Sequence, residues 1–530
     1  MKRVITLLVC LTMLVGMLSG CAGTGNETNK EVTGTEVQQV TSESVQGQEE
    51  KHEPVTLHYY VVGRAGQPDA EKVYSVVNEM IQEIYPWITV EFHVSNNADF
   101  ATHVALAQAS GDPVDILSSF GLTYQTEISN GTFMDITDYV DDFPALMSAL
   151  PEYTYDYAKL DGRQYGVVNY QQMNANNYSF AVEKEIADKY GYDTEAVDAL
   201  IQSSEFLNPE VYEHIGALLE AAWADGTELW LTYGPNTLGP QTRGYECLLE
   251  PMYIQITDES CQLVNIWETQ PVKDYLKALY EYKEAGFLPD DYYANRSVYN
   301  GAKGAANGYK RFIYNENNYV PNFPELRLTN WGVDLYFNQT MYSATDYYIG
   351  YNVLAGITGV GAASKYPEDA LRVIELLWTN EEIYNTLTWG LEGEHYEKNA
   401  DGSITTFEYN AGQAPADASY GMFYYNIGNG SLKWRNQSST EEFENWIYND
   451  LNKNAKKSPL IGFMPDTSRI SSKVSSITSV INEYGPLLLH GGAQDWETTY
   501  EEFLTKLDAA GLDTVMEILQ AQVDTFLKNK

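Results

Sequence analysis

Positive charge is scarce in this sequence. Its 530 residues include 32 lysines and arginines against 74 aspartates and glutamates, which gives a formal net charge of −42 at pH 7. A protein that binds nucleic acid needs an excess of basic side chains to displace the counterions of the phosphates. We therefore expect no nucleic acid among the partners, whereas the acidity itself identifies no ligand.

Cysteine is also rare. The chain has four cysteines, and no pair has the C-x-x-C spacing of a zinc site. In an oxidising exterior, Cys247 and Cys261 could form a disulfide that closes a small loop and contributes roughly 3 kcal/mol to stability. Two buried free thiols are the alternative.

Several catalytic motifs are absent. The sequence contains no G-x-x-x-x-G-K-[ST], G-x-S-x-G, G-x-G-x-x-G or H-E-x-x-H, so it offers no starting motif for phosphate binding, an elbow serine or a zinc hydrolase. His395 lies beside Glu392, Glu394 and Glu397, but without the H-E-x-x-H spacing we expect no metal there. The many acidic residues leave a carboxylate pair for glycoside hydrolysis open.

One segment has the spacing of a calcium-binding loop. Glu397, Asn399, Asp401 and Glu408 occupy positions 1, 3, 5 and 12 of an EF-hand loop, with Gly402 at position 6. Position 1 is glutamate rather than aspartate, however, and the residues after Gly402 alternate like a strand. An Asp-Gly pair is also a common hairpin turn, so we favour a hairpin over a calcium site.

The chain begins like a secreted protein. Lys2 and Arg3 precede an apolar run over residues 4–17, the layout of a signal peptide and too short for a span of about 20 residues. Residues 18–21, Leu-Ser-Gly-Cys, resemble the lipobox of bacterial lipoproteins. The resemblance implies a signal peptide at residues 1–20, lipidation of Cys21 and a location on the extracytoplasmic face of the cell membrane.

Residues 21–53 predict a flexible linker. The segment consists largely of Thr, Gly, Glu, Gln and Ser and has no Phe, Trp or Tyr, so it cannot bury enough apolar surface to offset the entropy of ordering. A random coil of about 30 residues spans on the order of 30 Å. The linker would hold a folded domain away from a membrane.

From residue 54 onward the pattern is that of an α/β protein. Strand-like segments at 55–62, 88–94 and 114–117 alternate with helical stretches at 73–84 and 99–109. This order predicts a parallel sheet covered by helices, with ligands at the carboxyl ends of the strands. Strands and helices continue to alternate, and two amphipathic helices separated by Gly511 close the chain. A chain of this length exceeds one core, so we expect at least two lobes.

Three segments carry a family resemblance: residues 161–168, 189–191 and 357–370. They resemble the bacterial extracellular solute-binding proteins of the maltose-binding-protein class, the capture components of ABC importers. Residues 161–168, Asp-Gly-Arg-Gln-Tyr-Gly-Val-Val, are similar to the turn and strand that precede the family's first crossover between lobes. Lys189-Tyr190-Gly191 is similar to the end of a helix in that family. Residues 357–370 are similar to the return crossover and its P-E-x-A helix. The resemblance implies a two-lobed α/β fold of the periplasmic-binding-protein (Venus flytrap) type with a hinge and C-terminal helices.

Residues 389–402 and 458–463 are similar to a subgroup of larger lipoproteins within that family. Members of this subgroup carry an extra C-terminal domain of unknown function. This match implies a structural or cleft-lining role for His395. The resemblance divides the chain into an N-lobe of residues 54–168 and about 364–425, a C-lobe of about 174–357 and 426–530, and hinges near 169–173 and 358–363.

The family implies capture of a carbohydrate, most simply an oligosaccharide, and its delivery to the permease subunits of an ABC importer by a monomer without catalytic residues or cofactor. The 42 tyrosines and 10 tryptophans suit a sugar or peptide ligand, although a tyrosine-rich lineage explains them equally. A surface-anchored glycoside hydrolase and a protein that binds peptides or amino-acid-like solutes are the alternatives.

Candidate ligand-binding residues come from predicted strand ends and loops. They are Arg64, Ser118, Asn169, Gln171, Tyr233, Trp331, Tyr348, Trp389 and Trp434. Arg64 follows the first strand, and its guanidinium can fork onto hydroxyls or a carboxylate or form a surface ion pair. The three tryptophans either offer flat faces to a sugar or belong to the core, and Ser118 and Gln171 rest on topology alone.

Overall fold

The computed structural model describes most of residues 52–530. The gaps are residues 123, 161, 172, 176–177, 205, 234–243, 300, 318–327, 329–331, 340–347, 350–355, 408–418, 438, 455 and 464. The chain divides into two units, residues 1–52 and 53–530, and every element below belongs to the second. The expected signal peptide, Cys21, nearly all of the expected linker and Trp331 lie outside the described residues.

The first sheet has five strands in the order β2-β1-β3-β16-β6. Its strands are β1 (Val55–Val62), β2 (Ile88–Ser95), β3 (Ile116–Ser118), β6 (Val167–Val168) and β16 (Ile357–Val360). The strands β1, β2 and β3 are parallel, as predicted, whereas β16 runs antiparallel between β3 and β6. A strand from late in the chain therefore completes a sheet begun near residue 55.

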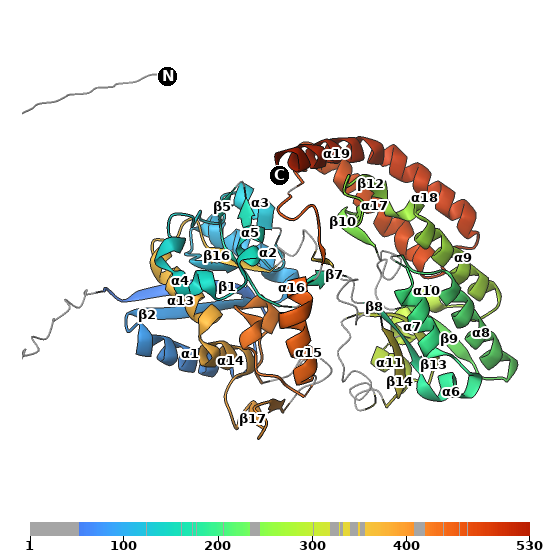
Figure 1. Ribbon diagram of the computed structural model, residues 1–530, viewed down its shortest axis with the longest axis horizontal. Coiled ribbons are helices and arrows are strands. Elements are labelled where there is room, and N and C mark those ends of the chain that lie inside the picture. The colour runs from blue at the N-terminus through green and yellow to red at the C-terminus, as the bar shows by residue number, and fades with distance from the viewer. Residues whose placement is uncertain are drawn as a thin grey trace, which may run out of the picture. The chain divides into compact units, whose positions relative to one another are not determined.

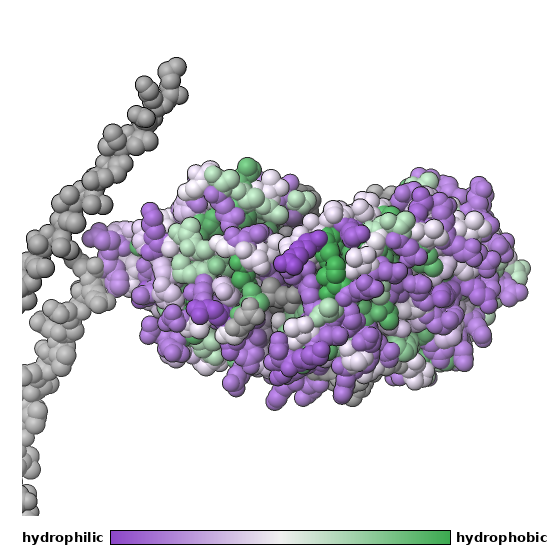
Figure 2. All heavy atoms as spheres, turned by 90° about the horizontal axis from the view of Figure 1, so that it is seen from above, coloured by the Kyte–Doolittle hydropathy of each residue, from purple (hydrophilic) through white to green (hydrophobic). Residues whose placement is uncertain are grey.

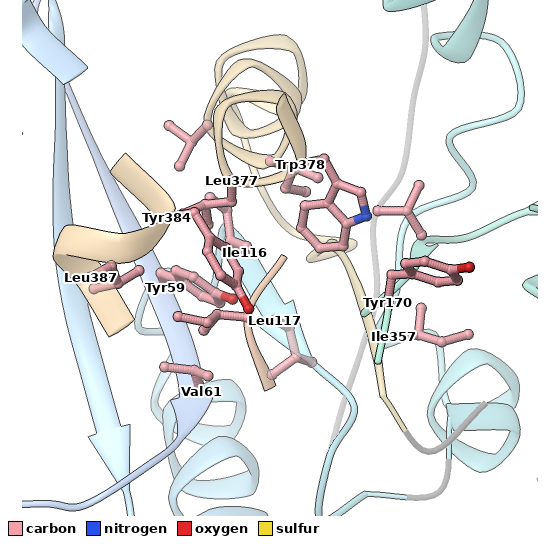
Figure 3. Packing of buried hydrophobic residues seen from close by; sticks show 14 of the residues in the cluster. Tyr59, Val61, Ile116, Leu117, Tyr170, Ile357, Leu377, Trp378, Tyr384 and Leu387 are labelled. Carbon is pink, nitrogen blue, oxygen red and sulfur yellow. The ribbon is translucent and has the colours of Figure 1, made fainter. Parts of the chain in front are cut away.

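Helices cover both faces of this sheet. They are α1 (Ala70–Ile84), α2 (Asn97–Ser110), α13 (Pro367–Thr379) and α14 (Glu381–Trp389). Tyr74 of α1 stacks on Phe92 of β2, while His103 of α2 hydrogen-bonds to Ser95, which points to the opposite face of β2. Figure 3 shows Tyr59 of β1 packed with Tyr384 and Leu387 of α14, all fully buried.

The second sheet has four strands in the order β14-β8-β13-β9. Its strands are β8 (Tyr178–Glu183), β9 (Leu229–Tyr233), β13 (Lys310–Asn317) and β14 (Leu335–Gln339), and the helices packed on it are α6 (Lys184–Tyr190), α7 (Thr194–Gln202) and α8 (Glu210–Ala224). The pair β9 and β13 is parallel, and β8 runs antiparallel to both of its neighbours. Figure 1 shows these helices grouped around the sheet.

Three helices close the chain. They are α17 (Ser471–Leu489), α18 (Trp496–Ala510) and α19 (Leu512–Asn529), and they pack on one another and, through α17, on α9 (Gln270–Glu284). The carboxylate of Asp495 accepts the backbone N–H of Thr498 and so caps α18. Gly511, at φ +96°, ends α18 in the left-handed region. The prediction of two terminal helices separated by Gly511 is confirmed.

A small antiparallel sheet lies beside these helices. It contains β10 (Tyr245–Leu249), β11 (Met252–Gln255) and β12 (Leu263–Asn265). Ile254 of β11 shares a buried cluster with Val523 of α19 and with Leu460 and Phe463. The remaining elements are short: α3 (Tyr124–Ser129), η1 (Val140–Asp142), α4 (Pro144–Ser148), α5 (Glu152–Tyr157), β4 (Lys159–Leu160), β5 (Arg163–Gln164), β7 (Asn174–Ala175), η3 (Ile266–Glu268), α10 (Tyr292–Tyr299), α11 (Gly301–Ala306), β15 (Tyr348–Ile349), β17 (Tyr396–Lys398), β18 (Ile404–Thr406), η6 (Tyr424–Asn426), η7 (Gly430–Leu432), α15 (Glu441–Asn445), η8 (Trp446–Leu451), α16 (Asn452–Asn454) and β19 (Lys456–Lys457).

The buried side chains form two large cores. The first draws mainly on residues 55–173 and 357–451 and also takes in Ala181, Leu335 and Phe337 of the second sheet. The second draws on residues 180–312 and 470–519. Residues 443–451 belong to the first core, whereas the expected lobe boundary at residue 426 assigns them to the C-lobe. The Asn452 side chain ties this segment to the first core, since its Nδ2 donates to the carbonyl of Gln171 at 2.7 Å.

Hydrophilic residues cover most of the face shown in Figure 2, in keeping with the acidic composition. No helix among the described residues combines the length and apolar character needed to span a membrane.

Candidate functional site

The candidate site lies where β1 and β3 end. Because these strands are parallel, their carboxyl ends meet at one edge of the sheet, and Arg64 and Phe120 each follow two residues after a strand. A distant segment joins them there. The Asn426 side chain donates to the carbonyl of Val62 at 3.0 Å, and Nη1 of Arg64 donates to the carbonyl of Gly421 at 3.3 Å.

The Arg64 guanidinium lies at one end of a cluster of three aromatic side chains. Its Cζ lies 4.7 Å from the ring centroid of Phe423. Phe423 stacks on Tyr425 with centroids 5.4 Å apart and ring planes at 12°, and Phe120 contacts Tyr425 at 5.6 Å. All four side chains are half-buried. Phe120, Phe423 and Tyr425, called the aromatic platform below, therefore combine flat apolar faces with a partly accessible cation.

Electrostatics keep this group in a defined charge state. Burial lowers the pKa of the Arg64 guanidinium, which nevertheless stays protonated in proteins at any ordinary pH. Burial, and secondarily the neighbouring Tyr424, raises the pKa of the Tyr425 hydroxyl, against a smaller lowering effect of Arg64. Near neutral pH the platform therefore presents a cation and a neutral phenol.

Asn169, Gln171 and Gly356 reach the same place. A Cβ added to Gly356 would lie 3.5 Å from Nε2 of Gln171, 3.5 Å from Cβ of Asn169 and 3.7 Å from the carbonyl oxygen of Tyr425. The Gln171 amide is thus close to the platform backbone, and its side chain is half-buried. Of the candidate residues, Arg64 and Gln171 have half-buried side chains at this site that a ligand can contact.

Asn169 and Ser118 lie beneath this surface. Asn169 is 1% exposed, and its Nδ2 donates to the carbonyl of Asn426 at 2.8 Å while its Oδ1 accepts the Thr358 hydroxyl at 2.7 Å. Ser118 is fully buried opposite Thr358 in the β3–β16 pair. These two side chains support the site from behind instead of facing a ligand.

Trp389 and Trp434 occupy a separate cluster with Tyr396 and Ile404. Nε1 of Trp434 donates to a carboxylate oxygen of Glu381 at 2.6 Å, and the Trp434 ring is 9% exposed. Their geometry matches the core alternative for the tryptophans. The side chains of Tyr233, the last residue of β9, and of Tyr348, the first of β15, are outside the described part, as is all of Trp331.

The prediction of a hairpin turn at Asp401 and Gly402 is confirmed. β17 and β18 pair antiparallel, and Gly402 at φ +82° follows the turn residue Asp401. Asp401 accepts hydrogen bonds from Ser403 and forms an ion pair with Arg435 at 2.6 Å. Together these contacts lower the Asp401 pKa to about 2.

His395 has structural contacts. Its Nδ1 accepts the backbone N–H of Leu391 at 2.9 Å, and its Nε2 lies 3.3 Å from a carboxylate oxygen of Asp69. Cys247 and Cys261 are free thiols, which matches the alternative to a disulfide. Cys261 is buried, and burial raises its thiol pKa to about 11.

Sequence reasoning missed the aromatic platform. Phe120 lies two residues after the short strand that contains Ser118, so topology alone could have found it. Phe423 and Tyr425 belong to the run Phe-Tyr-Tyr at residues 423–425. The density of aromatic residues there was a usable signal, but nothing local shows that this run returns to the end of β1.

A family model matches the C-terminal part of the chain. Residues 459–528 match a domain of unknown function, DUF3502. The matched segment includes α17, α18 and nearly all of α19. This agrees with the expected extra C-terminal domain.

Comparisons with whole proteins cover nearly the entire chain. A carbohydrate ABC transporter substrate-binding protein from Streptococcus pneumoniae is 23% identical over 535 residues, covering 98% of this chain and 97% of the relative. The crystal structure of the N-glycan transport solute-binding protein NgtS from the same species has a TM-score of 0.71 at 20% identity, covering 90% of this chain and 100% of NgtS. The chain is thus similar along nearly its whole length to solute-binding proteins of carbohydrate ABC transporters, and its C-terminal part matches DUF3502.

Two further structures show the same fold with bound sugars. NgtS in complex with Man1GlcNAc gives a TM-score of 0.63 at 20% identity, covering 89% of this chain and 99% of NgtS. The S. pneumoniae substrate-binding protein FusA in complex with kestose gives a TM-score of 0.55 at 12% identity, covering 90% of this chain and 100% of FusA. The α/β solute-binding fold expected from the sequence is therefore confirmed.

Proposed function

We propose that this protein captures an oligosaccharide outside the cytoplasm and delivers it to the permease subunits of an ABC importer. The observation that carries the proposal is the Arg64 guanidinium held over Phe423 and beside Tyr425 at the carboxyl ends of β1 and β3. Relatives named for carbohydrate transport share the fold along nearly the whole chain. Because they are transport proteins, the comparisons favour capture of a sugar over its hydrolysis.

The site has the chemistry that sugars require. Pyranose and furanose rings present C–H faces that pack against aromatic rings, and their hydroxyls need planar hydrogen-bonding partners. The aromatic platform supplies the faces, while Arg64 and the Gln171 amide supply donors, with the Gln171 carbonyl as an acceptor. The site contains no catalytic group in this proposal.

Closure of two lobes around the sugar is the mechanism we propose. We infer hinges near residues 169–173 and 358–363; Asn169 and Thr358, which share a hydrogen bond, lie in these segments. A ligand that contacts residues on both cores shifts the population toward the closed form, because it binds that form more tightly. The importer then recognises the closed form.

We also propose that lipid on Cys21 holds the protein at the extracytoplasmic face of the membrane, with residues 21–53 as tether. The basic start, apolar run and Leu-Ser-Gly-Cys motif support this. The variant Cys21→Ala is expected to appear in the medium with unchanged sugar affinity. Retention of this variant in the membrane fraction would contradict the anchor.

The binding site is tested by calorimetry on Arg64→Ala and Tyr425→Ala with mannose–GlcNAc glycans and fructo-oligosaccharides. Losing the charged donors of Arg64 should raise the dissociation constant roughly 10- to 100-fold, and losing the Tyr425 ring roughly 10-fold. Arg435→Ala, which removes an arginine paired with Asp401, is the matched control and should bind as wild type. Wild-type affinity in Arg64→Ala would place the sugar elsewhere, and release of shortened sugars would favour a hydrolase.

A further inference from the structure

Two histidines and a glutamate meet on the first sheet, away from the sugar site. The parallel register pairs His58 of β1 with Glu91 of β2, and Tyr60 with His93. Because side chains alternate along a strand, all four point to the same face. Nδ1 of His58 lies 2.9 Å from Nε2 of His93, and the Glu91 carboxylate oxygens lie 3.8 Å and 3.5 Å from these two nitrogens.

The surroundings hold these side chains in place but leave them accessible. The His93 ring stacks on Tyr60 with centroids 4.3 Å apart and planes at 13°. The backbone N–H of His58 donates to Oδ2 of Asp115 at 3.0 Å, which fixes the strand at that residue. The side chains of His58, His93 and Glu91 keep 21%, 30% and 56% of their exposure.

Helix α2 covers a different part of this face. Its His103 contacts Ser95, the last residue of β2. The helix ends at Ser110, and Asp112, two residues further, acts electrostatically on His93 and Tyr60. A carboxylate therefore lies near the histidines beyond the end of the helix.

The separations are close to those of a metal site. In tetrahedral zinc sites, bonds of 2.0–2.2 Å put neighbouring ligand atoms roughly 3.3–3.6 Å apart. The His93–Glu91 distance of 3.5 Å lies in this range, the His58–Glu91 distance of 3.8 Å lies above it, and the His58–His93 distance of 2.9 Å lies below it. A hydrogen bond between the two imidazoles accounts for the short His–His distance, and a protonated imidazole would also attract the Glu91 carboxylate. The Zn²⁺ titration below distinguishes this ion pair from a metal site.

We propose that His58, Glu91 and His93 bind a divalent transition-metal ion, Zn²⁺ in the first instance. Two neutral imidazoles and one carboxylate are ligands that Zn²⁺ favours. Asp112 or water would complete the coordination. The ion would link β1 to the edge strand β2, so its role would be to hold the start of the fold together. It takes no part in sugar binding, because His58 lies six residues before Arg64, about 20 Å along an extended chain.

The test uses the full chain, stripped of metal with a chelator and titrated with Zn²⁺ in competition with a chromogenic indicator. Wild type should take up about one equivalent, and His58→Gln and His93→Gln should bind it more than about 10-fold more weakly. His103→Gln removes a histidine from the same face and is the control, expected to bind as wild type. Equal Zn²⁺ affinity in wild type and His93→Gln, or no uptake by wild type, would overturn the site.

Two additional readouts make the result specific. Co²⁺ bound at this site should give the visible absorption of a four-coordinate ion in wild type and in His103→Gln, but not in His58→Gln. Zn²⁺ should raise the melting temperature of wild type but not that of His93→Gln. Sugar affinity should be the same in all these variants, so failure of the metal site and failure of the sugar site are distinguishable.

Discussion

The hydroxyl of Thr358 donates a hydrogen bond to Oδ1 of Asn169 at 2.7 Å, and neither side chain reaches solvent. These residues are 189 positions apart. The other end of the same amide donates to the carbonyl of Asn426. One buried side chain thus joins the segment after β6, the strand β16 and the segment that carries the aromatic platform.

The hydrogen bond between Asn169 and Thr358 should stabilise the fold, so the effects of mutating these two residues on the free energy of unfolding should depend on each other. Asn169→Ala leaves the Thr358 hydroxyl and the Asn426 carbonyl without their buried partner, and we expect it to lower the free energy of unfolding by about 1–3 kcal/mol. A double-mutant cycle with Thr358→Val, followed by urea unfolding, should give a coupling energy of roughly 1 kcal/mol. Strictly additive losses would contradict the link. Thr405→Val, at an exposed position, is the control and should change stability by less than about 0.5 kcal/mol.

Trp434 should matter for stability and not for the sugar. Trp434→Ala removes a large buried ring and the donor to Glu381, and we expect a loss of about 3–5 kcal/mol in thermal or denaturant unfolding. Trp434→Phe should lose less because it keeps most of the packing. Calorimetry on folded Trp434→Phe should give wild-type sugar affinity. A sugar affinity that falls in this variant would return Trp434 to the binding site.

His490 should make stability depend on pH. Burial, and secondarily the positive charge of Arg296, lowers its pKa to about 4 from an ordinary value near 6.5. The unfolded state therefore binds a proton more readily than the folded state between these two values. The stabilising contribution is complete above about pH 6.5 and is lost as the pH falls toward 4.

Denaturant unfolding across this pH range measures that effect. His490→Gln should flatten the dependence of the unfolding free energy on pH. Arg296→Gln should raise the pH at which this dependence ends on the acid side, because one cause of the lowered His490 pKa is removed. An unchanged slope in His490→Gln would assign the pH dependence to other groups.

The turn at Gly402 should behave as a hairpin turn without calcium. The residue has φ +82°, and a Cβ there would meet no other atom within 4 Å, so Gly402→Ala should cost about 1–2 kcal/mol from backbone strain alone. Gly402→Asn should cost less, because asparagine tolerates this conformation. Millimolar Ca²⁺ should leave the melting temperature of wild type unchanged. A rise with Ca²⁺ that Gly402→Ala abolishes would instead identify a calcium loop.

The local features of the fold could be predicted from the sequence. The alternation in residues 55–62 and 88–94 and the helical spacing between them depend on neighbouring residues, so β1, α1 and β2 appear as expected. The same holds for the hairpin at Asp401 and Gly402 and for the break at Gly511, where one residue type suits one backbone conformation.

Long-range contacts could not be predicted in the same way. Nothing near residues 423–425 indicates that they return to the end of β1, and nothing near residues 443–451 indicates that they pack in the first core. His58 and His93 lie 35 positions apart, and only the register of two strands brings them together. The family resemblance gave the topology, and the partners of single side chains followed only from the structure.

The position of β16 also has a consequence for how the protein is made. Ile116, Leu117 and Ser118 of β3 pair with residues 358–360, which a ribosome adds more than 200 residues later. Until then, the nascent first domain has an unpaired strand edge, a surface that invites pairing with other chains. Residues 357–360 must therefore emerge before the earliest part of the chain can finish folding. We expect chains truncated before residue 357 to aggregate readily, and chaperones have a defined interval in which to act.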